Sequence, residues 1–214
     1  MRIHDISQPL GEETAVWPGD RAVEIEWSQR RDRGDPVNVA ALHASVHAGT
    51  HMDGFLHLAD GGETAAEMPL DAGVGRCTVV DAIGCEEVGL EHVAGLDLAR
   101  TERILFHTRD AVDATLFPQA FAAISPDVAR ALAAAGVRLV GTDAPSVDRR
   151  DAVVLETHIV CANARIAILE SVVLTDVAPG EYSLIALPLR LVGADSSPVR
   201  AVLIEGAFED GVHT

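Results

Sequence analysis

The 214 residues of the chain include 33 acidic and 16 basic side chains, which give a formal net charge of −17. This imbalance works against binding to nucleic-acid phosphates and to anionic membranes, so we expect neither as a partner. Hydrophobic residues make up 48% of the chain, a composition typical of a globular protein with a substantial core.

Strands dominate the elements that the sequence predicts. In chain order, alternating or continuous apolar runs predict strands at 22–27, 37–46, 77–82, 103–107, 137–141, 166–174, 182–191 and 199–204. Helices are expected at 88–94, 125–135 and 155–163. The second helix is the clearest, because Ser125 is a typical N-cap, Pro126 suits the first helical position and Gly136 supplies a stop. The pattern indicates an α+β (mixed α/β) fold with a large mixed β-sheet and interspersed helices.

The sequence contains no internal repeat, low-complexity stretch or linker, so residues 1–214 are expected to form a single domain. The opening MRIHDISQPL lacks the features of a signal peptide, and no apolar run is long enough to span a membrane. Cys77, Cys85 and Cys161 are odd in number and form no CxxC pair, which favours reduced cysteines. A cytoplasmic location is therefore expected.

Four of the nine histidines lie between residues 43 and 57, around the stretch HAGTHMD. Gly49 allows a sharp turn, because glycine tolerates positive φ. Such a turn would fold His51 and Asp53 back towards His47. Two imidazoles and one carboxylate at the end of a strand form a suitable ligand set for a divalent cation such as zinc or manganese.

Three ligands leave a divalent cation under-coordinated, so other parts of the chain must contribute. The acidic and imidazole candidates on apolar segments are His107, Asp143, Glu156, His158 and Glu170. Glu170 ends the apolar run IAIL, where an unpaired buried charge would be costly and a metal would compensate it. The alternative is a surface glutamate at a strand end, and spacing alone leaves both interpretations open.

The motif and several further segments resemble the metal-dependent cyclase-like hydrolase family. The resemblance covers nearly the whole chain, through HDIS, AVWPGD, DPVNVAALHASVHAGTHMD, MPLDA, GVRLVGTDAPSVD, AILESVVLTDVAPGEYSLIALPLRL and the segment 195–203. The WPGD turn, together with LIALPLR and SPVRAVL, points to the formamidase branch of the family. The resemblance implies a swivelling β/α/β-like domain.

The resemblance also implies a site with two divalent cations, with zinc expected and manganese as the alternative. The family's metal ligands fall on His47, His51, Asp53, His158 and Glu170. The first three and Glu170 would hold one cation. His158 would hold the second, with Asp53 and Glu170 bridging the two. The catalytic histidine of the family falls on His57, and its substrate-contacting tryptophan falls on Trp17.

The activity that the resemblance implies is hydrolysis of N-formyl-L-kynurenine to L-kynurenine and formate, in tryptophan degradation. Metal-activated water would attack the formyl carbonyl, and His57 would transfer a proton to the leaving aryl amine. Trp17 would give the small aromatic N-formyl substrate a flat apolar wall. The resemblance further implies a homodimer or a higher homo-oligomer.

The sequence departs from the family pattern after the motif aspartate, where Gly54 and Phe55 replace the usual Ala-Pro. Glycine is expected to loosen this turn, and Phe55 would place a ring near His57 as a second substrate contact. Ala144 replaces a commoner threonine, a milder change. The departure keeps open another amide or lactam hydrolase of the family, similar to isatin hydrolase. A non-catalytic metal-binding protein is a third possibility, against which the intact His57 argues.

Overall fold

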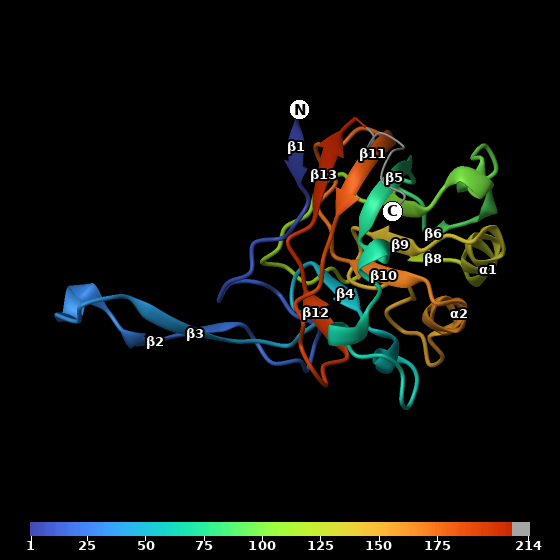
Figure 1. Ribbon diagram of the computed structural model, residues 1–214. Helices are drawn as coiled ribbons and strands as arrows, with labels where there is room; N and C mark the ends of the chain where they lie inside the picture. The colour runs from blue at the N-terminus through green and yellow to red at the C-terminus, as the bar shows by residue number, and fades with distance from the viewer. Residues whose placement is uncertain (207–214) are drawn as a thin grey trace, which may run out of the picture.

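A computed structural model describes residues 1–206, and nine of its strands form one sheet (Figure 1). In sheet order the strands are β1 (Ile3–Asp5), β13 (Val202–Glu205), β11 (Gly180–Ile185), β5 (Val74–Asp81), β7 (Arg103–His107), β9 (Leu139–Thr142), β10 (Ala167–Glu170), β4 (His51–Asp53) and β12 (Ser196–Pro198). The central strands β5, β7, β9 and β10 run parallel, while the outer pairs are antiparallel. The prediction of a large mixed sheet is confirmed.

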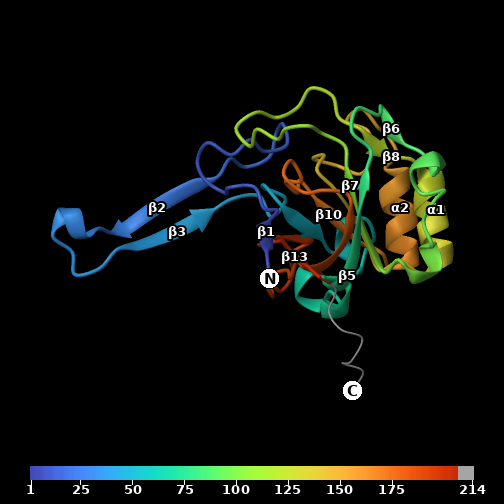
Figure 2. The same ribbon diagram turned by 90° about the horizontal axis from the view of Figure 1, so that it is seen from above.

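Two α-helices, α1 (Pro126–Ala135) and α2 (Glu156–Ala164), lie together on one side of this sheet (Figures 1 and 2). The predicted caps of α1 are confirmed, because the Val128 amide donates to the Ser125 hydroxyl oxygen and Gly136 adopts a φ of 80°. The buried face of α1 packs Val128, Ala129 and Leu132 into an apolar cluster with residues of β7 and β9. The two predicted helices 125–135 and 155–163 therefore agree with the structure to within one residue at each end.

Four predicted elements need correction. The strands expected at 166–174 and 182–191 end early, because β10 stops at Glu170 and β11 stops at Ile185. The helix expected at 88–94 is wrong: β6 (Glu87–Val88) pairs with β8 (Ala123–Ile124), and a single 3-10 turn follows. Glycines at both ends of this segment leave too few residues to offset the cost of helix nucleation. The strand expected at 37–46 is shorter, because β3 (Val39–His43) ends before the metal motif.

A two-stranded arm is formed by β3 and β2 (Glu24–Gln29), and both views show it projecting from the body on the side away from α1 and α2 (Figures 1 and 2). Short 3-10 helices occupy Arg31–Arg33, Phe55–His57, Ala65–Glu67, Leu70–Ala72, Leu90–His92 and Leu98–Arg100. The three cysteines are free, and burial raises the pKa of Cys161 to about 12. Within residues 1–206, no helix is both long and apolar enough to cross a membrane.

A buried arginine fixes the start of β5. The Arg103 guanidinium donates to the carbonyl oxygens of Ala72 at 2.8 Å and Arg76 at 3.2 Å, and also to that of Asp71. Gly75 has a φ of 141°, and a β-carbon there would collide with this guanidinium. Both the conformation and the close approach therefore require glycine.

We expect Gly75→Ala to lower the free energy of unfolding by about 2–4 kcal/mol, because backbone strain and steric overlap add. Urea titration of the two proteins would measure the difference. Gly84→Ala is the matched control, since Gly84 also has positive φ but its β-carbon would meet nothing within 4 Å. The Gly84→Ala control should lower the free energy of unfolding by about 1–2 kcal/mol, because only backbone strain is introduced there. Equal losses in the two variants would contradict the steric role of Arg103.

Candidate metal centre and active site

Three elements and one turn bring the predicted metal ligands together. β4 carries His51 and Asp53, and it pairs with β10 so that Glu170 lies opposite His51. His158 comes from the first turn of α2. Gly49, with a φ of 64°, makes the predicted sharp turn that returns His47 to the same place. All five residues therefore meet at the end of β4.

The Asp53 carboxylate lies between the three imidazoles. Its Oδ1 atom is 3.1 Å from His47 Nδ1 and 3.5 Å from His51 Nε2. Its Oδ2 atom is 3.7 Å from His158 Nε2. The two oxygens of Asp53 therefore face different histidines.

Glu170 spans the same gap from the other side. Its Oε2 atom is 3.3 Å from His51 Nε2, and its Oε1 atom is 3.3 Å from His158 Nε2. The Val147 amide also donates to Oε1 at 2.7 Å, which fixes the carboxylate. Two carboxylates thus link the His51 side of the cluster to the His158 side.

Each of the three imidazoles directs one nitrogen into the cluster and has its other nitrogen held by an acceptor. His51 Nδ1 donates to the Gly49 carbonyl oxygen at 2.9 Å. His158 Nδ1 donates to Asp148 at 2.6 Å, and His47 Nε2 donates to Asp195 at 3.0 Å. With the outer nitrogen protonated in this way, the inner nitrogen presents its lone pair, as in metal-binding histidines.

The inner atoms of the cluster lack the partners that burial demands. His51 Nε2 and both carboxylate oxygens of Asp53 are buried without a hydrogen bond. Asp53 and Glu170 are 5% and 4% exposed, so two carboxylates sit in a nearly dry site. Because unpaired buried polar atoms are costly, this imidazole and carboxylate set fits a divalent cation.

The pKa values of the cluster residues are shifted by burial and by the charges of their neighbours. Burial disfavours the imidazolium of His47, but Asp53 and Asp195 outweigh it and raise its pKa to about 9. Burial likewise opposes the carboxylate of Asp53, yet the adjacent imidazoles of His158 and His47 hold its pKa well below the ordinary value. The pKa of His158 is raised, because Asp148, Asp53 and Glu170 outweigh its burial. The carboxylates therefore attract positive charge, which protons or a metal can supply.

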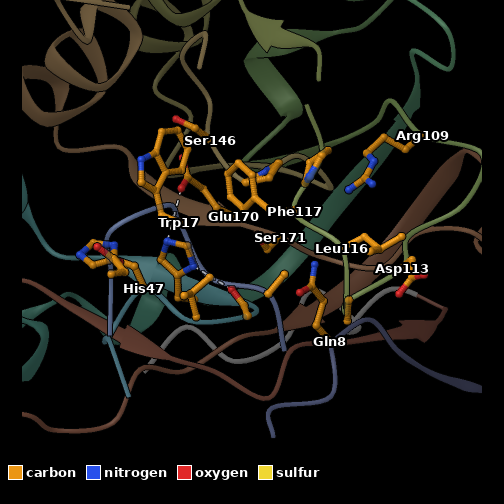
Figure 3. Close-up of a pocket in the computed structure, with 18 of the residues that line it drawn as sticks. Gln8, Trp17, His47, Arg109, Asp113, Leu116, Phe117, Ser146, Glu170 and Ser171 are labelled. Atoms are coloured by element: carbon orange, nitrogen blue, oxygen red, sulfur yellow. Dashed lines mark hydrogen bonds and ion pairs between the residues drawn. The ribbon is translucent and has the colours of Figure 1, made fainter. Parts of the chain in front are cut away.

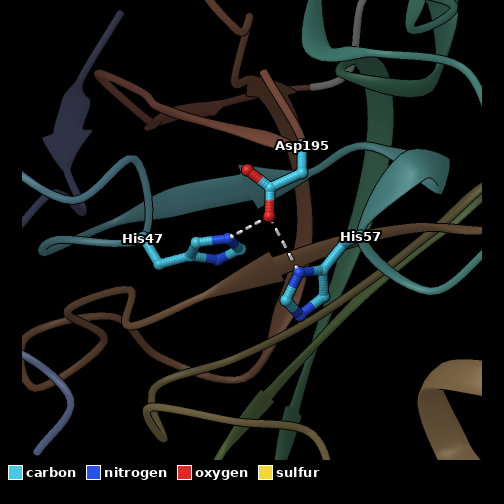
Figure 4. Close-up of side chains that lie close together, drawn as sticks. All are labelled: His47, His57 and Asp195. Carbon is cyan, nitrogen blue, oxygen red and sulfur yellow. Dashed lines mark hydrogen bonds and ion pairs between the residues drawn. The ribbon is translucent and has the colours of Figure 1, made fainter. Parts of the chain in front are cut away.

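His57 lies next to this cluster and is held by a carboxylate that the sequence did not identify. Its Nδ1 donates to Asp195 Oδ2 at 3.1 Å, the oxygen that His47 also contacts (Figure 4). The ring centroids of His57 and His47 are 4.5 Å apart. Atoms of His57 also come close enough to Asp53 and His158 to form a second possible cation site. The geometry thus offers His57 two roles, as a proton carrier or as a ligand.

Asp195 and Asp148 are the functional candidates that sequence reasoning missed. Both lie within segments that carry the family resemblance, 195–203 and GVRLVGTDAPSVD. Asp148 accepts the amides of Thr157 and His158 as well as the His158 ring, so it fixes the start of α2 against the cluster. No periodicity or spacing links either aspartate to the histidines that it contacts.

A cavity of about 330 Å³ opens beside the cluster, and His47, His51, His57, His158 and Glu170 contribute to its wall (Figure 3). Trp17 also lines it and meets Phe117 edge to face at 5.2 Å. Phe55 does not line this cavity: it is buried in the core, under the Arg165 guanidinium. The structure therefore brings Trp17 to the cavity and leaves Phe55 outside it.

Backbone hydrogen bonds fix the turn at Gly54 and Phe55. The Gly54 amide donates to the Asp195 carbonyl oxygen at 2.8 Å, and the Leu56 amide donates to that of Glu63 at 2.9 Å. A β-carbon on Gly54 would lie 3.0–3.2 Å from three backbone atoms, so glycine permits this close approach. These contacts hold the backbone that carries His57.

The remaining candidate ligands lie elsewhere. Glu156 is exposed and pairs with Arg130 on the surface. Asp143 and His107 are buried at the ends of β9 and β7, where they hold the turn at Thr108 and Arg109. Burial raises the pKa of Asp143, although hydrogen bonds from this turn oppose the shift. Of the five later candidates, His158 and Glu170 thus join the cluster.

Comparison with known proteins identifies the family of the chain. Residues 4–149 match the family model described as "Putative cyclase". The chain is 47% identical to a kynurenine formamidase of Salinibacter ruber, over 95% of this chain and 97% of that protein.

Among solved structures, one described as a potential metal-dependent hydrolase with cyclase activity is 29% identical, with a TM-score of 0.81 over 94% of this chain and 96% of the other. Isatin hydrolase A from Labrenzia aggregata, bound to benzyl benzoate, shares the fold with a TM-score of 0.80 at 22% identity, over 96% of this chain and 94% of the other. The chain therefore belongs to the cyclase family of metal-dependent hydrolases.

Proposed function

We propose that the chain is a metal-dependent formamidase that hydrolyses N-formyl-L-kynurenine to L-kynurenine and formate. The observation that carries the proposal is the buried cluster of imidazoles and carboxylates, some of whose polar atoms lack hydrogen-bond partners. It lies at the wall of a cavity lined with aromatic rings. The 47% identity to a kynurenine formamidase, over nearly the full length of both proteins, supports the choice of substrate. A cavity of about 330 Å³ has room for a ligand of this size.

Two divalent cations are proposed, because each carboxylate reaches both sides of the cluster. His47 and His51 would hold one cation and His158 the other, with Asp53 and Glu170 shared between them. When bound, such cations activate water as a nucleophile and polarise a carbonyl oxygen. Zinc is proposed and manganese is the alternative, since imidazole and carboxylate ligands suit both.

The chain's own residues position the substrate and move the proton. Trp17 and Phe117 offer apolar ring surfaces for the aryl group and keep water from it. His57 is oriented through Nδ1 by Asp195, which leaves Nε2 to carry a proton. As the bond between the formyl carbon and the aryl nitrogen breaks, His57 would deliver that proton to the nitrogen, which leaves as a neutral amine.

A second candidate function is opening of a lactam ring, as in isatin. This function is considered because the chain shares its fold with isatin hydrolase A, although at 22% identity the likeness extends to the fold alone. Gly54 and Phe55 no longer favour it, because Phe55 lies in the core rather than at the cavity. Assembly as a homodimer or larger homo-oligomer and a cytoplasmic location stay predictions, as does a contact between Trp17 and the substrate.

The test is a hydrolysis assay on N-formyl-L-kynurenine beside isatin, with the metal content of the same sample measured by mass spectrometry. We expect hydrolysis of the formamide, its loss after chelation, and its recovery when zinc or manganese is returned. Full activity in a verified metal-free sample would contradict metal dependence. Opening of isatin with negligible formamide hydrolysis would favour the second function.

A further inference from the structure

One end of the cavity carries an arginine side chain that has no part in the chemistry proposed at the metal cluster. Arg109 and Asp113 line the cavity together with Leu116, on the side away from His47 (Figure 3). Within residues 1–206, Arg109 is the one arginine among the lining residues, and the chain contains no lysine. Apart from the imidazoles and the proposed metal cations, the guanidinium of Arg109 is thus the source of positive charge among the described residues that line the cavity.

The guanidinium of Arg109 keeps most of its donors available. Nη1 donates to the Asp143 carbonyl oxygen at 3.3 Å, and in the described part of the chain no carboxylate forms an ion pair with it. Other arginines differ: Arg138 and Arg165 pair with Asp71 and Glu63 at 2.9 and 2.8 Å. A planar fork of unpaired donors at a cavity wall is well suited to a carboxylate.

Buried polar side chains hold the backbone of Arg109 in place. The amides of Thr108 and Arg109 donate to Asp143 Oδ2 at 2.9 and 3.0 Å, and His107 Nε2 donates to the Arg109 carbonyl oxygen at 3.0 Å. Asp143 is 0% exposed and His107 is 5% exposed. Two buried groups without contact to the metal cluster are therefore used to position this turn. Such support lowers the entropic cost of binding a ligand to Arg109.

Asp113 places a negative charge at the same end. Its Oδ1 accepts the Thr115 amide at 2.9 Å and the Thr115 hydroxyl at 2.6 Å, which orients the carboxylate. It forms no ion pair with Arg109, although both line the cavity. A cation and an anion that are separate and unpaired match the two charges of an α-amino acid.

We propose that Arg109 binds the α-carboxylate of the substrate and Asp113 binds its α-ammonium group. This inference rests on the proposed function, in which the substrate carries an amino-acid end as well as an aryl formamide. The net charge of −17 would otherwise repel a carboxylate, so Arg109 lets that group enter and sets its direction. The amino-acid end at Arg109 then points the formamide towards the metal cluster.

The test compares two substrates on the metal-loaded enzyme: N-formyl-L-kynurenine, and 2′-formamidoacetophenone, which has the same aryl formamide without the amino-acid end. Arg109→Met should lower kcat/KM for N-formyl-L-kynurenine by about 10- to 100-fold, mainly through KM, because a charged hydrogen-bonded contact is lost. It should leave 2′-formamidoacetophenone unaffected. Arg109→Lys should recover part of the loss, and Asp113→Asn should give a smaller selective loss.

Arg149→Met is the matched control, since Arg149 is exposed and contacts Asp151 outside the cavity. It should change neither substrate. If Arg109→Met affected both substrates equally, or neither, the inference would be overturned while the proposed function stood. If the wild-type enzyme hydrolysed neither formamide, both the proposed function and the inference would fall.

Discussion

Asp53→Ala should empty the metal centre and abolish hydrolysis. Asp53 is the residue whose two oxygens face His47 and His51 on one side and His158 on the other. Without it, the centre loses a ligand shared by both proposed cations. Turnover should fall by about a thousandfold or more, because losing a single major electrostatic contribution to catalysis already costs about a hundred- to a thousandfold. Metal analysis of the purified variant and its rate on N-formyl-L-kynurenine would measure both effects.

Asp20→Asn is a suitable control for metal content, because Asp20 lines the same cavity but accepts a hydrogen bond from Ser45 at 2.8 Å and lies outside the cluster. It should keep its metal. Circular dichroism of Asp53→Ala would check that the sheet still forms. A folded Asp53→Ala variant that retains two metal equivalents would rule out the bridging role.

Local signals account for the parts of the fold that the sequence predicted well. The predicted strand 103–107 coincides with β7, a continuous apolar run, and α1 follows its Ser-Pro cap and its glycine stop. β4 was not predicted as a strand, because its three residues form one only by pairing with β10 and β12. Tertiary context decided that segment.

The same distinction holds for the site. The motif around Gly49 predicted the return of His47 towards His51 from local geometry, and the structure has that turn. Residue types left five later candidate ligands open, and the resemblance singled out His158 and Glu170. Asp195 lies 138 residues from His57, so no spacing rule could connect them. The sheet places β12 beside β4 and thereby brings Asp195 next to the histidines.

His57→Ala should keep the metals and lose most of the activity. The structure places His57 beside the cluster, with Nδ1 committed to Asp195 and its ring at the cavity wall. Removing a positioned acid–base group typically lowers turnover by about a hundredfold or more. The loss should appear in kcat, because His57 is assigned to the departure of the amine rather than to binding. Steady-state kinetics with metal analysis of the same sample would separate the two roles that the geometry allows.

His57→Gln is the matched variant, because its amide can still donate to Asp195 but cannot carry a proton at neutral pH. It should therefore hold its metals and fold normally, yet remain about as slow as His57→Ala. Added imidazole should restore part of the rate of His57→Ala, since a free base can enter the space that the side chain leaves. If His57→Ala instead lost metal together with activity, and imidazole restored both, then His57 would be a ligand, as its approach to Asp53 and His158 also permits.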